Sequence, residues 1–209
     1  MPLKGRRGEH MFKKTILASL FIAAASSGVF ADTYNVSTTL SLEEQKTLAQ
    51  QLYQRMAELD SKEYEEIATL HTQVIEKCPD SLRAQKSCWQ LSNLFILKQQ
   101  NHQAAIDVLE HLLTRYPDTE LKEIATNRLI ACYGETGDYA KLCKLYEEMF
   151  DKDIKPSDKY YKARALDYAK ALDAMGKSED AKKWYREVIN NDKNGNSLEA
   201  RAARRLLGE

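Results

Sequence analysis

The sequence predicts an all-α fold made of antiparallel helix pairs stacked in an array. Apolar residues recur with a period of about 3.6 residues almost throughout the chain after residue 40, as they do on amphipathic helices. Strand signals are nearly absent, because no run alternates Val, Ile and Thr with polar residues. Few polar stretches exceed about six residues, so the connections are short and neighbouring helices are expected to be antiparallel.

The composition is that of a globular domain or a repeat array. Of the 209 residues, 43% are hydrophobic and 30% charged, with only 8 Gly and 4 Pro, which excludes disordered, collagenous and polytopic membrane chains. Residues 32–209 hold 26 basic and 30 acidic side chains. This mildly acidic balance argues against a nucleic-acid partner, which usually meets a basic protein face.

The first segment has the pattern of a secretory signal peptide. Lys13 and Lys14 precede the apolar run 15–25, and small residues lead to Ala31. We therefore predict a signal peptide over residues 1–31, with Met11 as an alternative start, and a periplasmic or secreted protein. The run is short of the roughly 20 apolar residues of a membrane span, so an uncleaved anchor is the weaker alternative. No cysteine near the cut offers a site for lipid attachment.

Breaks in the periodicity separate the expected helices. They fall at Pro79, Pro117, Pro156, Gly137 and Gly176. Residues 32–40 are expected to be a flexible N-terminus, followed by a helical domain over 41–208. Its helices are expected at 42–59, 62–77, 81–98, 101–116, 119–134, 138–150, 157–175, 178–191 and 197–207. Ser41 and Glu44 have the spacing of a capping box at the first start.

A repeat emerges when the turns inside the helix pairs are aligned. Lys62, Gln100, Gly137 and Gly176 serve as equivalent turn residues, spaced 38, 37 and 39 apart. Apolar or aromatic residues then recur in columns on the second helix of each pair. Nine residues after the turn stand His71, Leu109, Tyr146 and Tyr185. Each pair can bury its apolar face only against the next pair, which is the property of a stacked repeat.

These columns resemble the tetratricopeptide repeat over about residues 45–192. The residues that carry the resemblance are Trp89, Ala105, Pro117, Tyr133, Gly137, Tyr139, Tyr146, Gly176, Ala181 and Tyr185. The period exceeds the usual 34 residues, His71 stands in an aromatic column, and Asn93 takes a small-residue position. The long period, the sequence 115–118 and the signal are also similar to periplasmic proteins related to outer-membrane assembly lipoproteins and the Tol-Pal coordinator. The resemblance implies a right-handed superhelix of about four units.

The last helix is expected to cap this array. Leu198, Ala202 and Leu206 form an apolar stripe that we expect to face the preceding pair. Arg201, Arg204 and Arg205 are expected to face water, where the basic last turn complements the helix dipole.

Motifs for catalysis or metal binding are scarce, so no catalytic residue, metal or cofactor is predicted. The histidines form no His-Glu-x-x-His or similar ligand pair, and no glycine-rich phosphate loop or nucleophile turn occurs. His71 is expected to be a column residue with a hydrogen-bond partner. An enzyme is therefore the least favoured function.

The four cysteines allow disulfides in an oxidising compartment. Cys132 and Cys143 lie at about the same height on opposite helices of the third pair, although Cys132 is off the apolar face. Cys78 and Cys88 are offset by roughly 9 Å across their turn, more than a bridge usually spans. A Cys132–Cys143 bond is the favoured pairing, and four small buried thiols are the alternative.

The resemblance implies a protein that binds a partner protein or peptide segment on the concave surface lined by first helices. The family's concave positions fall on Gln90, Leu94, Leu97, Asn127, Ala131, Leu166 and Lys170. Leu94 and Leu97 belong to a helix that is apolar around much of its circumference, so they are either an exposed patch or core. The alternative function is a structural subunit of an envelope assembly complex that binds through its outer face. The oligomeric state is left open.

Overall fold

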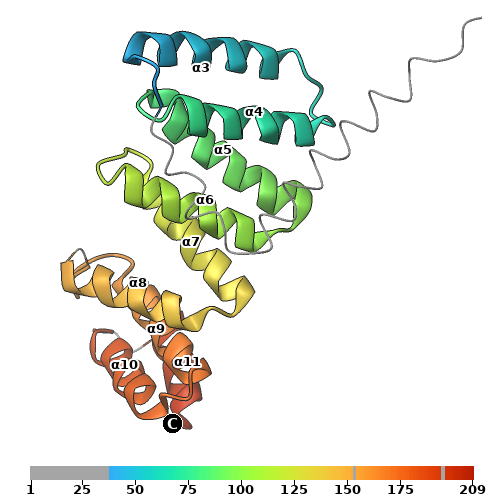
Figure 1. Ribbon diagram of the computed structural model, residues 1–209. Helices are drawn as coiled ribbons and strands as arrows, with labels where there is room; N and C mark the ends of the chain where they lie inside the picture. Colours follow the sequence, from blue (N-terminus) through green and yellow to red (C-terminus); the bar gives the residue numbers. More distant parts are fainter. Residues whose placement is uncertain (1–37, 153, 194–195) are drawn as a thin grey trace, which may run out of the picture. The chain divides into compact units, whose positions relative to one another are not determined.

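The computed structural model describes residues 38–152, 154–193 and 196–209. The predicted signal peptide and most of the predicted flexible N-terminus lie outside these residues. Every regular element that is described is an α-helix (Figure 1). The helices are α3 (Leu42–Ala57), α4 (Tyr64–Lys77), α5 (Leu82–Gln99), α6 (His102–Arg115), α7 (Lys122–Thr136), α8 (Tyr139–Lys152), α9 (Tyr161–Ala174), α10 (Ser178–Asn190) and α11 (Leu198–Leu207).

The predicted all-α fold is confirmed, and each expected helix is found with shifted ends. The start of α9 moves most, from the expected residue 157 to Tyr161. Asp158 explains the delay, because its carboxylate accepts a hydrogen bond from the Lys155 N–H at 2.7 Å. Its carbonyl accepts one from the Tyr161 N–H at 3.0 Å. These bonds hold the segment after Pro156 in a turn, so the helix begins only after it.

Side-chain caps start several helices. Ser41 and Glu44 form the predicted capping box on α3: the Ser41 N–H donates to the Glu44 carboxylate at 2.8 Å. The Ser41 hydroxyl donates to the same carboxylate at 2.6 Å. The hydroxyl and the N–H of Ser41 together lower the pKa of Glu44. The Asn101 side chain accepts from the Ala104 N–H at 3.0 Å and begins α6. The chain therefore specifies these helix starts locally, as the capping rules predict.

Left-handed residues end the first helix of three pairs. Gln100, Gly137 and Gly176 have φ values of 51°, 72° and 76°, and they are the turn residues of the predicted repeat. Gly208 has the same conformation, with φ 78°, at the end of α11. The first pair differs, because α3 ends at Glu58 in a right-handed conformation.

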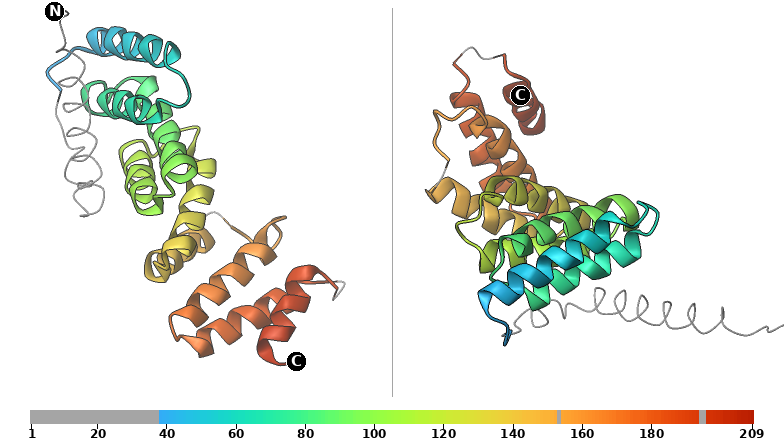
Figure 2. Two further views of the ribbon diagram at one scale, coloured as in Figure 1. Left: turned by 90° about the vertical axis from the view of Figure 1, so that its right-hand side faces the viewer. Right: turned by 90° about the horizontal axis from the view of Figure 1, so that it is seen from above.

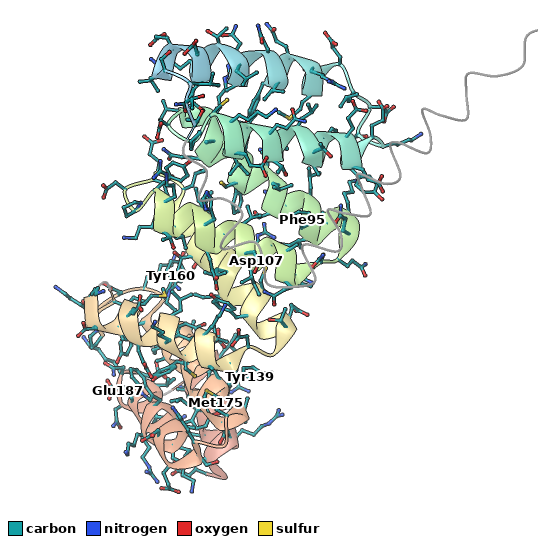
Figure 3. The ribbon with its side chains drawn as sticks, viewed as in Figure 1. Phe95, Asp107, Tyr139, Tyr160, Met175 and Glu187 are labelled. Atoms are coloured by element: carbon teal, nitrogen blue, oxygen red, sulfur yellow. The ribbon has the colours of Figure 1, made fainter. Side chains whose placement is uncertain are left out.

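The chain divides into two compact units, residues up to Cys132 and residues from Tyr133. In the first unit, α3 packs on α4, α4 on α5 and α5 on α6 (Figure 1). Leu91, Phe95 and Leu112 are almost fully buried between these helices; Figure 3 labels Phe95.

A buried polar network joins three helices of the first unit. The Ser87 hydroxyl on α5 lies 3.0 Å from the Tyr53 hydroxyl on α3 and 3.2 Å from His71 Nδ1 on α4, in hydrogen bonds. The Tyr53 and His71 rings also meet edge to face, with centroids 5.8 Å apart. Burial lowers the pKa of His71 to about 4. His71 is thus a buried column residue with a hydrogen-bond partner, as predicted.

The loops between consecutive pairs are tied to each other in the first unit. The Tyr116 hydroxyl donates to the Pro79 carbonyl at 2.6 Å, and Arg115 pairs with Asp80 at 3.1 Å. Gln45 on α3 reaches Asp80 as well, at 3.0 Å. These contacts link equivalent loops of successive repeats. Tyr116, which precedes Pro117 at the end of its repeat, thus ties its loop to the loop of the preceding repeat.

An aromatic cluster forms the core of the second unit. It comprises Tyr146, Phe150, Tyr161, Tyr168 and Trp184, from α8, α9 and α10. The closest ring centroids are those of Phe150 and Trp184, 4.6 Å apart, and of Tyr168 and Trp184, 4.9 Å apart. The buried Tyr161 hydroxyl donates to Glu187, labelled in Figure 3, at 3.0 Å. The Tyr168 hydroxyl donates to Glu147 at 2.9 Å, so the polar ends of the rings are satisfied.

Helix α11 packs on α10 and α9 (Figure 2), but with a different face from the one predicted. Leu198 and Leu206 were expected to be buried and are exposed, and Ala202 is half-buried. The fully buried residues are Ala200 and Ala203. Their small side chains allow α11 to lie close to its neighbours, which bulkier leucines at these positions would prevent.

Local signals fix both ends of α11. The Ser197 side chain accepts from the Ala200 N–H at 3.2 Å at the start, and Gly208 ends the helix. Of the arginines expected in water, Arg201 and Arg205 are exposed and Arg204 is half-buried.

Candidate protein-binding surface

Helix α5 carries an exposed face that mixes apolar and polar side chains. Leu82 is 78% and Leu97 70% exposed, and Lys86 and Gln90 between them are exposed too. The two leucines are separated by about 22 Å along the helix, at 1.5 Å per residue. Since the opposite side of α5 is buried against α4 and α6, the exposed leucines are additional to what the core requires.

Cationic side chains stack on aromatic rings beside this face. Arg83 lies 4.8 Å from the centroid of Tyr53, on the α3 side. Arg128 of α7 lies 5.4 Å from the centroid of Trp89, on the other side. Such contacts hold a guanidinium in place without neutralising it. The α5 face is therefore flanked by fixed positive charges that a partner's carboxylates could meet.

The part of α7 that belongs to the first unit also has an exposed face. Ile124 is 45% exposed, and Asn127 and Ala131 are exposed. The stacking of Arg128 on Trp89 brings α7 next to α5. Within the first unit, the first helices of two successive pairs thus offer small, apolar and polar side chains to a partner.

In the second unit, α9 offers little apolar surface. Lys170 is exposed and pairs with Asp167 at 3.1 Å. Leu166 is only 6% exposed, because α9 packs against α8, α10 and α11. Met175, labelled in Figure 3, is partly exposed just beyond the end of α9. The open face of α9 is therefore mainly charged.

A comparison with family models accounts for this architecture. The model described as the tetratricopeptide repeat-like domain matches residues 12–206. The chain belongs to this family. Domains of this tetratricopeptide repeat-like kind generally mediate protein–protein interactions and are typically scaffolds without catalytic activity. A search of the curated proteins found no match.

Most of the residues predicted to line a groove in this tetratricopeptide repeat-like protein are accessible. The exposed ones are Gln90, Leu97, Asn127, Ala131 and Lys170. Leu94 is half-buried, so it is neither fully exposed nor part of the core, which were the two alternatives for this residue. The prediction for Leu166 was wrong, because this side chain belongs to the core of the second unit. That any of them contacts a partner stays a prediction.

Sequence reasoning missed four accessible residues. Leu82 and Lys86 precede the predicted positions on α5 by one or two turns, and the family pattern does not mark them. Leu198 and Leu206 were assigned to the core. Aligning Gly208 with Gln100 would have corrected that assignment, because it places Leu198 at the position of Gln90 and Leu206 at that of Lys98, which are both exposed on α5.

The cysteines are all buried, with at most 3% exposure. Burial raises the pKa of the Cys88 thiol to about 12. Cys143 is a thiol rather than half of a disulfide here, so the predicted Cys132–Cys143 bond is not formed in this structure. Whether this bond forms in an oxidising compartment stays a prediction.

No cluster of three metal-ligating side chains occurs within the residues described above. None of the helices from α3 to α11 is long and apolar enough to cross a membrane.

Proposed function

We propose that this protein is a non-enzymatic interaction scaffold of the bacterial periplasm or cell envelope, and that the exposed faces of its first helices bind a segment of a partner protein. The α5 face carries the proposal. It combines two largely exposed leucines with polar side chains on a helix whose other faces are already packed. Exposed apolar side chains beside polar groups, on a helix that does not need them for packing, commonly mark an interaction site.

Burial of these leucines supplies part of the binding free energy. Full burial of a leucine side chain stabilises by about 1.5 to 3 kcal/mol. Leu97 and Leu82 are more than two-thirds exposed, so a partner that covers them gains most of this amount for each. Gln90 and Asn127 can add hydrogen bonds that orient the bound segment.

The proposed compartment rests on the N-terminal sequence alone. The basic pair Lys13 and Lys14, the apolar run 15–25 and the small residues before Asp32 have the organisation of an export signal. Fractionation of cells that produce the tagged chain tests this part. A mature protein in the periplasmic fraction that begins at Asp32 supports export, and an unprocessed protein in the cytosol contradicts it.

Site-specific photo-crosslinking tests the binding surface. A photoreactive residue at Leu97 or Asn127 is expected to form one defined adduct with a partner protein. The matched control is Thr114, an exposed residue on the second helix α6. Adducts from Thr114 and none from Leu97 would instead favour the alternative, a structural subunit that binds through its outer face.

A further inference from the structure

The outward face of α11 is an exposed apolar stripe. Leu198 and Leu206 are 76% and 47% exposed, and Ala202 lies between them. The three residues are spaced four apart, so they form one ridge along about 12 Å of helix. The opposite face is already buried against the second unit through Ala200 and Ala203. The stripe is therefore not the face by which this helix is mainly packed.

The register of α11 identifies it as one more first helix. Gly208 ends α11 in the left-handed conformation with which Gly176 ends α9. Positions five and eight residues before the glycine are buried in both helices: Ala171 and Tyr168 in α9, Ala203 and Ala200 in α11. Positions ten and six before it are Leu166 and Lys170 in α9, and Leu198 and Ala202 in α11. Leu198 and Ala202 thus occupy register positions that the family pattern assigns to the concave surface. The equivalent Leu166 is buried in α9, whereas Leu198 is exposed in α11.

A row of positive charge runs beside the stripe. Arg201 follows Leu198 by three residues and Arg205 follows Ala202 by three, so both are neighbours of the ridge on the helix surface. Both are exposed, and in the described ranges neither forms a salt bridge. Glu199, half-buried, lies on the other flank. A partner that covers the leucines would bring its own side chains against these two arginines.

We propose that the α11 stripe (Leu198, Ala202 and Leu206) binds an acidic amphipathic helix of a partner protein, with carboxylates of that helix paired to Arg201 and Arg205. A ridge of residues spaced four apart packs well into the groove of another helix. Arginine accepts a carboxylate in two parallel hydrogen bonds. In an antiparallel pair of two copies, this arginine row would face its own equivalent, which disfavours a second copy as the occupant. The inference rests on the proposed function, since it takes the chain to be a binding protein, but it concerns a different helix from α5.

The test uses the full chain and two labelled synthetic peptides of about 18 residues, long enough to form a marginal helix. One peptide has leucines four apart with glutamates beside them, and the other has lysines in place of the glutamates. Fluorescence anisotropy is expected to show at least about tenfold tighter binding of the acidic peptide. The double variant Leu198→Ser, Leu206→Ser is expected to lose at least about tenfold in affinity, with unchanged thermal unfolding because both side chains are exposed. Arg201→Glu with Arg205→Glu is expected to reverse the preference toward the basic peptide.

Leu42→Ser is the matched control, because Leu42 is 46% exposed at the start of α3 and belongs to neither the α5 face nor the α11 stripe. It is expected to leave binding of the acidic peptide unchanged. If Leu97→Ser abolishes binding and the α11 variants do not, the α11 inference fails while the proposed function stands. Absence of peptide binding, or equal affinity for both peptides, overturns the inference.

Two further outcomes would replace the proposed occupant. Sedimentation equilibrium could show a dimer that the α11 double variant converts to monomer, in which case the stripe contacts a second copy. Co-sedimentation with phosphatidylglycerol vesicles that the same variant abolishes would assign the stripe to an anionic lipid surface. Either result would overturn the proposal that the stripe binds an acidic helix of a partner protein.

Discussion

Three leucines on α5 have three different environments within seven residues. Leu91 is fully buried, Leu94 is half-buried and Leu97 is 70% exposed. Their sequence context is similarly apolar, so only the direction of each side chain around the helix separates core from surface. This helix therefore offers a matched series in which burial varies and residue type does not.

Alanine substitution along this series should separate stability from binding. Leu91→Ala is expected to cost about 2 to 5 kcal/mol, as for other buried leucines. Leu97→Ala is expected to change the free energy of unfolding by less than about 0.5 kcal/mol, as a surface substitution does, and Leu94→Ala should fall between them. Urea denaturation followed by circular dichroism measures the three values. Leu97→Ala should nonetheless weaken partner capture, and a large loss of stability at this position would contradict its assignment to the binding surface.

His71 should make the first unit sensitive to acid. The pKa of His71 is about 4 in the folded protein and 6.5 in its unperturbed state. Between these two pH values, His71 is protonated in the unfolded chain but neutral in the folded one. The contribution is fully present above pH 6.5 and is lost as the pH falls, by about 3 kcal/mol at pH 4 and below. Urea midpoints between pH 7 and 4.5 measure this loss.

The control is His71→Gln, which keeps a polar group near Ser87 but does not titrate. Its stability is expected to fall less steeply between pH 7 and 4.5 than that of the parent. Carboxyl groups such as Glu76 titrate in both proteins and cancel in the comparison. Parallel pH profiles for the two proteins would rule out His71 as the source of the acid sensitivity.

At the scale of the elements, the turn residues predict opposite effects for two substitutions. Gln100 adopts a left-handed conformation, with φ 51°, that costs a residue with a Cβ about 1 to 2 kcal/mol. Gly176 adopts the same conformation without that cost, and a Cβ placed there would meet no atom within 4 Å. Gln100→Gly is therefore expected to stabilise the protein by about 0.5 to 1 kcal/mol. Glycine removes the left-handed backbone strain, but part of that gain is offset because glycine loses more conformational entropy on folding.

The paired substitution Gly176→Ala is expected to destabilise by about 1 kcal/mol, through the backbone alone. Chemical denaturation of both variants beside the parent protein gives the two changes. A stabilising Gly176→Ala would mean that the turn can adopt a right-handed conformation, and the equivalence of the turns would then be lost.

Helix positions were predictable because their signals are local. The Ser41 capping box, the proline breaks and the glycine turns act within a few residues, and each helix was found. The start of α9 was misplaced because the Asp158 turn delays it. The face of α11 was also misplaced, because leucine was assumed to be buried where two alanines give closer packing. That choice depends on the neighbouring helices α9 and α10, which sequence periodicity alone does not represent.

At the scale of the whole molecule, the candidate surface was predictable only in part. The family register located exposed positions such as Gln90 and Asn127. It failed at Leu166, because α9 has neighbours on three sides and the same register position is covered there. Exposure of a repeat position thus depends on where its helix stands in the array, in addition to its place in the repeat.

The cysteines provide a global probe of the fold. All four are buried, and the reactive thiolate is disfavoured by burial at Cys88. The native protein is therefore expected to react with Ellman's reagent only as fast as it opens, and completely in strong denaturant. The thiol count of protein purified under oxidising conditions and then denatured decides the disulfide prediction: two thiols support the Cys132–Cys143 bond, and four exclude it.

The arginines of α11 have a consequence for self-assembly. Four and seven residues before its closing glycine, α9 carries the buried Leu172 and Ala169, whereas α11 has Arg204 and Arg201 at the corresponding positions. A helix pair of another molecule that stacked on α11 would therefore contact arginines at positions where α9 has buried apolar side chains. End-to-end growth into fibres, which open head-to-tail contacts permit, is thus opposed at this helix. A concentrated solution should remain clear, with light scattering that rises in proportion to concentration.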